Sequence, residues 1–519
     1  MRLKTTLIIV FGLLFAFINV SVGQLLYNAE KKFVVTELQH DFKILRHALE
    51  QAHIGLYRYS GKESIDAFFD SCYARIDRPM TEIDFFRLIS GIMLQVRDEH
   101  TYLLPSADYW KNEIGQTTYS GASSKSKARL FPFFIKIIND RLFIENNLSG
   151  DLSLQEGTEI LAINHKPAAE VIAKLLVTVH TNGLVETFRY RNLEQFSLNQ
   201  TYNRFIVHYA IYIGRPDTFH LEIKRTGAGQ SQSVKVAALA SSEIFNNYWR
   251  RYSAINDSKK VKEFPVNFKL LNPRVAYLRL SDFHNYVWQK YNLSYSTEYR
   301  NDFKFIKDRN LRHLIIDLRG NEGGNLAIGM DLLKYISIRT YRPYHYHELK
   351  NYRFPSLYKY IDDSTTFDKY RDSMFIKVAG NVYRSDPRLS TEVWSRPMEP
   401  VANPYNGKLY VLVDGATGSA ASILATLIRV NRKDAIFIGE ESGGDMEGPV
   451  SGDGLSIVLP NTKLRAEVPY IKRVVNLNGY PNEKGRGVMP DYHITPIPED
   501  LTGNKDTELE FTLKLIQGQ

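Results

Sequence analysis

The chain has 519 residues, and a composition of 44% hydrophobic and 24% charged residues is typical of a folded protein rather than a disordered one. Its length exceeds what one hydrophobic core usually serves, so we expect two or three domains. The formal net charge of +9 is spread along the chain without a dense basic block or zinc-finger spacing, which argues against nucleic-acid binding and favours solubility or weak peripheral association with an anionic cell envelope.

The first 23 residues have the pattern of a secretory signal peptide. Two basic residues precede the apolar run from Leu7 to Phe17, and Ser21 and Gly23 fit a cleavage site. We therefore predict that residues 1–23 are removed and that the mature chain is periplasmic or secreted. An uncleaved N-terminal anchor is the alternative, although the apolar run is short for a membrane span.

Residues 24–105 are predicted to form a helical bundle. Apolar residues recur at helical spacing in three runs, of which Leu38, Phe42 and Leu45 belong to the first. The single cysteine, Cys72, can form no disulfide within the chain, and we expect it to pack as a small hydrophobic residue. Stability must then come from core packing, and redox chemistry is not expected.

A short polar turn, Asp98-Glu99-His100-Thr101, ends this helical region. An isolated histidine at such a place is usually a structural residue, so the turn by itself does not identify a site. His100 therefore has two interpretations at this point, a structural one and a catalytic one.

A β-rich domain is predicted over residues 125–240, after a polar linker near 105–128 that is rich in Ser, Gly and Lys. The segment Leu154–Leu176 has a glycine turn, a buried strand and a helix in that order. Further strand-like runs are Phe131–Ile138, Arg141–Glu145, Phe219–Lys224 and Ser233–Ala237.

Two strand-to-helix turns stand out in residues 265–500. In Leu314–Asn325 a buried strand ends in a turn where glycines, among them Gly323 and Gly324, can direct their amides at a ligand oxygen. In Leu409–Gly444 a buried strand is followed by a turn of small residues and then by helical spacing, which places Ser419 at the junction.

Ser419 has a chemical and a structural interpretation. A hydroxyl on such a turn is exposed, and the free amides of the helix N-terminus can stabilise negative charge beside it. The alternative is that Ser419 or Thr417 merely caps the helix.

Together these turns resemble the tail-specific (C-terminal processing) and tricorn-core serine protease family. Asp317–Gly324 matches its Asp-Leu-Arg-x-Asn-x-Gly-Gly turn, and Thr417, Ser419 and Ala420 match its Thr-x-Ser-Ala turn. Gly487–Asp491 matches its closing Gly-Val-x-Pro-Asp mark. The turn at His100 matches the Asp-x-His-Thr turn of the tricorn-like branch through Asp98, His100 and Thr101.

The resemblance implies an α/β protein, with a ClpP/crotonase-like ββα-superhelix catalytic domain in residues 265–500. It implies that Ser419 is the nucleophile and His100 the general base. Backbone amides of Gly323 or Gly324 and of Ala420 would form the oxyanion hole. The C-terminal processing branch uses a lysine base, but Asp445 stands at that place here, so a Ser–Lys dyad is not supported.

The third catalytic residue is less well defined by the resemblance. The tricorn-like branch has a glutamate shortly before the closing mark, and Glu483 is the candidate, although it lies one position further from that mark than the pattern expects. Glu99 occupies the place of a serine in tricorn, and the resemblance assigns it no role.

The β-rich region resembles a PDZ-like domain inserted between the helical bundle and the catalytic part. The matching residues are Gly157, Ile160, Ala162, Ile163 and Asn164. Two positions depart from the pattern: Thr158 replaces the usual Asp, and His165 replaces the usual Gly. Such domains bind extended peptides at a sheet edge, and a spacer that has lost its groove is the alternative.

Residues 340–400, rich in Tyr, Pro and Arg, are interpreted as a segment that covers the site or lines a substrate groove. The pair His345 and His347 suggests a metal, but no carboxylate or cysteine cluster accompanies it, so we interpret the two as ordinary histidines in a solvated loop. Neither a zinc-protease motif nor a Walker loop is present. No metal, nucleotide or other cofactor is therefore predicted.

The sequence thus predicts an exported serine peptidase that cleaves peptides or protein tails. A catalytically inactive homologue that binds peptides is the alternative, which the missing lysine favours and the joint presence of Ser419 and His100 opposes. An esterase is disfavoured because no Gly-x-Ser-x-Gly elbow occurs. The natural substrate, endo- or exopeptidase action and oligomeric state do not follow from the sequence.

Overall fold

The structure is a computed structural model that describes residues 27–115, 128–197, 202–252, 264–362, 374–385, 395–502 and 505–518. The predicted signal peptide lies outside the described residues. Among the helices that are described, none is long and apolar enough to cross a membrane.

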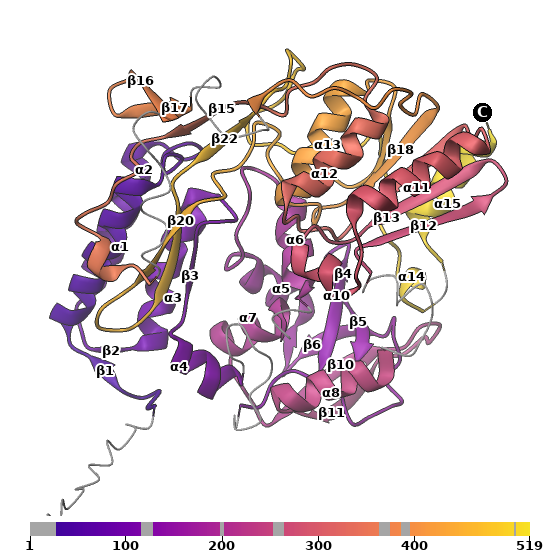
Figure 1. The fold of residues 1–519 in the computed structure, drawn as a ribbon. Helices are drawn as coiled ribbons and strands as arrows, with labels where there is room; N and C mark the ends of the chain where they lie inside the picture. The colour runs from indigo at the N-terminus through magenta and orange to yellow at the C-terminus, as the bar shows by residue number, and fades with distance from the viewer. Residues whose placement is uncertain are drawn as a thin grey trace, which may run out of the picture.

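Three helices form the N-terminal region, as the helical spacing predicts (Figure 1). The last of them ends at Arg97, which has a left-handed backbone with φ of 56° and turns the chain into the segment that carries His100. Cys72 is buried in this region and is a free thiol. The elements are β1 (Lys32–Phe33), α1 (Val35–Ala52), α2 (Lys62–Ala74), β2 (Met80–Thr81), α3 (Glu82–Val96), β3 (Tyr102–Leu104) and α4 (Ala107–Tyr109), with a π-helical turn at Trp110–Ile114.

The β-rich region contains the predicted strands, with their ends displaced by up to two residues. They form an antiparallel sheet of order β11-β10-β6-β5-β4, and β7 pairs with β6 at its side. Its strands are β4 (Phe133–Ile138), β5 (Arg141–Asn147), β6 (Glu159–Ile163), β7 (Lys166–Pro167), β10 (Thr218–Lys224) and β11 (Gln232–Ala237). The helices of the region are α5 (Ala168–Leu176), α6 (Glu186–Glu194), α7 (Arg204–Tyr212) and α8 (Ser241–Tyr252), and a small hairpin joins β8 (Phe196–Ser197) to β9 (Tyr202–Asn203).

A mostly parallel sheet of order β12-β13-β14-β18-β19-β23 carries the two motif turns. Only β12 runs antiparallel to its neighbour. The strands are β12 (Val266–Asn272), β13 (Val275–Leu280), β14 (His313–Asp317), β18 (Lys408–Val413), β19 (Ile436–Gly439) and β23 (Tyr492–His493). The helices are α10 (Asn285–Lys290), α11 (Tyr295–Asp308), α12 (Leu326–Ile336), α13 (Ser419–Asn431), α14 (Glu499–Thr502) and α15 (Thr507–Gln517).

Both faces of this sheet are covered, which explains the continuous apolar runs in its strands. Leu314 and Ile316 of β14 belong to the apolar cluster that α11, α12 and α13 complete, whereas Ile315, between them, belongs to the cluster that Ile516 of α15 joins. Figure 1 shows α12 and α13 side by side over the sheet. The sheet is therefore the middle layer of a three-layer α/β arrangement.

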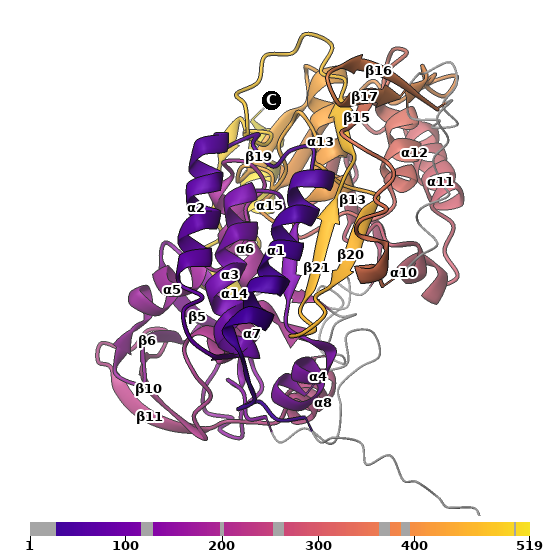
Figure 2. The same ribbon diagram turned by 90° about the vertical axis from the view of Figure 1, so that its left-hand side faces the viewer.

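Two smaller sheets lie in the C-terminal region, and one of them includes a strand of the N-terminal region. One has the order β16-β17-β15-β22, formed by β15 (Tyr344–Leu349), β16 (Phe375–Ala379), β17 (Val382–Ser385) and β22 (Lys472–Val475), with a 3₁₀ turn at Tyr358–Tyr360 nearby in sequence. The other pairs β20 (Gly454–Val458) with β21 (Arg465–Pro469) and β21 with β3. Figure 2 shows β20 and β21 running beside α1.

The large apolar cluster crosses the predicted domain boundaries. It contains Leu38 of α1, Ile135 of β4 and Val468 of β21, so one core joins the helices, the β-rich region and part of the C-terminal region.

The prediction that His345 and His347 lie in a solvated loop needs correction. Both residues belong to strand β15, which pairs with a strand on each side, and His347 is 3% exposed. Because Tyr344–Leu349 consists mainly of tyrosine and histidine, its buried positions do not appear in the sequence as alternating apolar residues.

Candidate active site

Ser419 is the first residue of α13 and sits on a strained turn. Its φ is +45°, a left-handed conformation that a non-glycine residue adopts only where the surroundings enforce it. The N-cap residue is Gly418, so Ser419 does not cap the helix. Thr417 does not cap it either, because its hydroxyl donates to the carbonyl of Leu318 at 3.0 Å and ties the two motif turns together.

His100 reaches Ser419, the predicted nucleophile, from a distant part of the chain. Its Nε2 lies 3.1 Å from Oγ of Ser419, although the two residues are 319 positions apart in sequence. The His100 amide donates to Oδ1 of Asp98 at 2.9 Å, and Oδ2 of Asp98 accepts the amide of Val450 at 3.0 Å. Asp98 thus fixes the histidine turn against a loop of the C-terminal region.

Two carboxylates flank the His100 imidazole. Nδ1 lies 3.6 Å from Oδ1 of Asp98, and Nε2 lies 3.8 Å from Oε1 of Glu99. Burial lowers the pKa of His100, but the nearby carboxylates of Asp98 and Glu99 outweigh it, so this pKa is raised above its usual value. Burial raises the pKa of Asp98, but its interactions with His100 outweigh burial and leave it lowered. The acids therefore stabilise an imidazolium at His100.

Glu99 also contacts the backbone of the nucleophile. Its Oε1 accepts the amide of Ser419 at 3.2 Å and the side-chain amide of Asn182 at 3.3 Å. Burial raises the pKa of Glu99. This contact does not follow from the motif, since neither spacing nor periodicity indicates which acid beside His100 faces the serine.

The glycine turn packs directly against the nucleophile turn. Gly418 donates its amide to the carbonyl of Asn321 at 2.9 Å. A Cβ on Gly323, which has φ of +94°, would lie 2.6 Å from the Ala420 nitrogen and 2.8 Å from Cβ of Ser419. Glycine is therefore required at this position for the two turns to approach so closely.

The two predicted glycines of the oxyanion hole differ in their hydrogen bonds. The amide of Gly323 donates to Oδ1 of Asn321 at 2.9 Å, so this donor is already used within the turn. Gly324 and Ala420 both line the cavity at Ser419. The Ala420 amide lies in the first turn of α13, where helix geometry leaves amides without a carbonyl acceptor.

Glu483 is not brought to this site. Its side chain is exposed, and it is not among the residues that line the cavity at Ser419. Asp98 occupies the position beside His100 that sequence reasoning gave to Glu483. Asp445, at the place of the lysine base, instead accepts Arg58 at 2.8 Å and the Tyr59 hydroxyl at 2.6 Å, and no lysine is among the lining residues.

A cavity of about 670 Å³ opens beside Ser419. Its wall combines elements far apart in sequence, with Phe188 and Arg204 from the β-rich region and Tyr344 and Arg473 from the sheet of β15 and β22. The sequence analysis did not identify these wall residues, because only the fold brings them together. Within the described residues, no group of three or more side chains is arranged to hold a metal ion.

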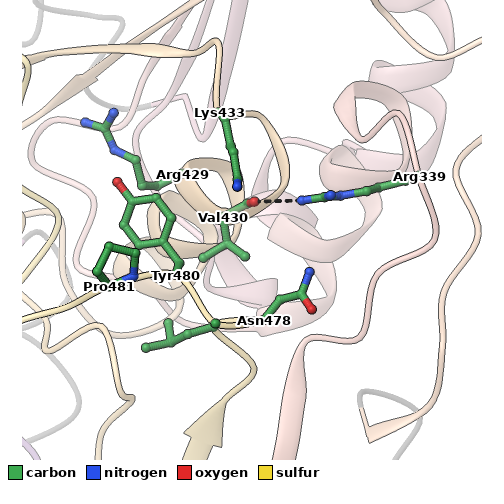
Figure 3. A pocket seen from close by; sticks show the side chains of 9 residues that line it. Arg339, Arg429, Val430, Lys433, Asn478, Tyr480 and Pro481 are labelled. Carbon is green, nitrogen blue, oxygen red and sulfur yellow. Dashed lines mark hydrogen bonds between the residues drawn. The ribbon is translucent and has the colours of Figure 1, made fainter.

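A second cavity, of about 210 Å³, lies at the opposite end of α13 and holds none of the predicted site residues (Figure 3). Arg339 donates there to the carbonyl of Val430 at 3.1 Å. Arg429 is paired with Asp491 at 3.0 Å. The cations near the last turn of α13 suit the negative end of the helix dipole, which is sufficient to explain them.

Comparison with known proteins agrees with the geometry. Residues 274–494 match the model of peptidase family S41. The matched residues form an S41 peptidase domain, and the chain is a serine-type peptidase. No curated protein sequence is similar enough to match.

Solved structures share the fold of this S41 peptidase at low sequence identity. Mature CPAF matches with a TM-score of 0.58 and 14% identity, over 90% of this chain and 94% of CPAF. CPAF complexed with lactacystin matches with a TM-score of 0.59 and 13% identity, over 93% and 97% of the two chains. The photosystem II D1 C-terminal processing protease covers 91% of this chain and 95% of its own at 14% identity, but its TM-score is only 0.38.

The first prediction for this peptidase concerns the close approach at Gly323. Gly323→Ala should slow labelling of Ser419 by a fluorophosphonate about 100-fold, because the new methyl group collides with the nucleophile turn. Gly320→Ala is the matched control, since Gly320 also has positive φ but open space around its Cβ position. The measurement compares the labelling rates and the thermal unfolding of both variants with those of the wild type. Unchanged labelling of Gly323→Ala would contradict the assigned packing.

The second prediction concerns pH. A general base must be neutral, so the labelling rate should rise with pH through the raised pKa of His100. Asp98→Asn removes a negative charge 3.6 Å from Nδ1 of His100, so this rise should move to lower pH and the maximal rate should fall at least about tenfold. Asp108→Asn, an exposed aspartate nearby in sequence, should change neither. A pH profile of Asp98→Asn that overlays the wild type would refute the role of Asp98.

Proposed function

We propose that this S41 peptidase is exported and hydrolyses peptide bonds of peptides or protein tails, with Ser419 as nucleophile and His100 as general base. The observation that carries the proposal is the 3.1 Å distance between Nε2 of His100 and Oγ of Ser419. A serine hydroxyl is a weak nucleophile near neutral pH and needs a base at this distance.

In the proposed reaction, His100 takes the hydroxyl proton while Oγ of Ser419 attacks the substrate carbonyl carbon. The resulting oxyanion accepts hydrogen bonds from the amides of Ala420 and Gly324. His100 then gives the proton to the leaving amine, and an acyl-enzyme remains. Water attacks this ester with His100 again as base, which releases the second product and restores the serine.

Asp98 takes the orienting role in this proposal, in place of Glu483. It is 3% exposed, holds the backbone of His100 by a hydrogen bond and lies 3.6 Å from Nδ1. A buried carboxylate there favours the tautomer that leaves Nε2 free to accept the serine proton. It also stabilises the imidazolium formed during attack.

The finer parts of the fold are also proposed. We propose that the catalytic sheet with its helices is a ClpP/crotonase-like ββα superhelix, supported by the parallel order β13-β14-β18-β19. We propose that the β-rich region is a PDZ-like module, supported by its antiparallel sheet with α5 following the short hairpin of β6 and β7. Its role would be to present an extended peptide to the neighbouring cavity.

A second candidate function is peptide binding without hydrolysis. The specific observation behind it is that the Ser419 amide is bonded to the Glu99 carboxylate, which sets a negative charge where an oxyanion would be stabilised. The strained backbone at Ser419 and the hydrogen-bond distance between Nε2 of His100 and Oγ of Ser419 favour the peptidase.

Export is proposed from the sequence pattern of residues 1–23. The mature protein would work in the periplasm or outside the cell, where a positively charged chain is drawn to an anionic envelope surface. Mass spectrometry of the protein from its native host should give an N-terminus at Gln24. An intact N-terminus at Met1 would reject cleavage.

The third prediction tests the catalytic pair. A serine-reactive phosphonate should label the wild type, and both Ser419→Ala and His100→Ala should lose labelling, the first completely and the second by about 100-fold or more in rate. Ser422→Ala is the matched control, because Ser422 lies one helical turn away and donates to the Ser419 carbonyl. Equal labelling of Ser419→Ala would reject the assignment of the nucleophile.

The fourth prediction tests recognition of tails. Peptides that differ only in their last few residues, or in a free against an amidated C-terminus, should differ in kcat/KM at least about tenfold if the β-rich region captures the tail. An internal-sequence change far from the cleavage site serves as the control. If kcat/KM does not depend on the C-terminus, the proposed peptidase activity stands, but the proposal that the β-rich region binds substrate tails is contradicted.

A further inference from the structure

The carboxylate of Glu322 lies in the wall of the active-site cavity. It belongs to the glycine turn, directly before Gly323. The described residues provide it with neither a hydrogen bond nor an ion pair within 4 Å. Its side chain is exposed and faces the cavity. A carboxylate in such a place is free to accept a cationic group of a ligand.

The groups around Glu322 make this part of the cavity acidic. Asp282 and Glu99 are negative charges that act on it. His284 is paired with Asp282, with Nδ1 3.0 Å from Oδ1. Arg204 is the opposing cation, but it donates to Oδ1 of Asn192 at 2.7 Å. Within the described residues, neither Arg204 nor His284 forms an ion pair with Glu322.

Tyr286 adds an aromatic surface next to these acids. It is 45% exposed, and its ring centroid lies 5.4 Å from that of His284. The charges of Asp282 and Glu322 both act on its hydroxyl, and burial together with these charges raises its pKa above the usual value. An exposed aromatic ring among carboxylates is a favourable surface for an organic cation.

We infer that Glu322 is a specificity residue that accepts the cationic side chain of a lysine or arginine in the peptide substrate. The inference rests on the proposed function, because it assigns part of the same cavity to substrate recognition. Because Glu322 directly precedes Gly323 and Gly324, a cation bound to its carboxylate would lie close to the scissile bond. A charge-assisted contact of this kind discriminates by about tenfold or more.

The preference should depend on pH in a definite direction. Burial raises the pKa of Glu322 to about 7, with Arg204 and His284 opposing the rise and Asp282 and Glu99 adding to it. Above this value the carboxylate is charged and holds a cation. Below it the carboxyl is neutral, so the preference for a basic residue is lost as pH falls.

The fifth prediction tests the subsite by binding, so that it does not depend on catalysis. Eight-residue peptides of alanine and leucine, each with one lysine at a different position, are compared with norleucine analogues by fluorescence anisotropy on Ser419→Ala protein. One lysine position should bind about tenfold more tightly than its norleucine analogue at pH 8, and by a smaller factor at pH 6. Adding Glu322→Gln should remove the difference. The matched control Glu63→Gln, an exposed residue of α2, should retain it.

The outcomes separate this inference from the proposed function. Equal affinity of every lysine and norleucine pair, absence of binding, or a lysine preference that survives Glu322→Gln overturns the subsite. If wild-type protein then cleaves the peptides, the peptidase stands without this specificity. If lysine is preferred through Glu322 but the wild type cleaves nothing, the subsite stands and the peptidase proposal fails.

Discussion

The parallel pairing of β14 with β18 is the constraint on which the site depends. The pairing sets Asp317 opposite Leu412, so both strands end at the same edge of the sheet and their turns leave it side by side. Carboxyl ends of parallel strands are the usual location of sites in open α/β sheets. The hydroxyl of Thr417 and the amide of Gly418 then bond across the two turns, which makes them one rigid unit.

A buried ion network anchors the base of that unit. The Asp317 carboxylate accepts the Tyr277 hydroxyl at 2.7 Å and the guanidinium groups of Arg279 and Arg319 at 2.8 and 2.7 Å. Burial alone would raise the pKa of Asp317, but the two arginines outweigh it and keep this carboxylate ionised. Arg319 also pairs with Glu508 of α15, so the C-terminal helix is connected to the glycine turn. Because these charges are paired with one another, the network supports the position of the glycine turn and is not itself a reactive site.

Local sequence signals predicted the elements but not their association. The strands predicted at Phe219–Lys224 and Ser233–Ala237 are present because apolar periodicity reports on local structure. The meeting of Ser419 and His100 was predicted through family resemblance, since no periodicity connects residues so far apart. Glu483 was chosen for its distance from a motif, whereas Asp98 is held beside His100 by contacts that only the folded chain contains. Glu322 escaped notice because the motif allows any residue there.

The pairing of β3 with β21 determines how much of the chain must be synthesised before the turn of His100 is held in place. Ala466 and Glu467 pair with the strand that directly follows His100, and the amide of Val450 donates to Asp98, so residues late in the chain help to hold the turn of His100. His53 of the N-terminal region also holds this turn, because its Nε2 lies 2.8 Å from the Thr101 hydroxyl. During synthesis the imidazole emerges early and the serine late. The proposed pair of Ser419 and His100 can therefore assemble fully only after the segment of β21 has been made, and a fragment truncated before β21 lacks a strand that holds the turn of His100.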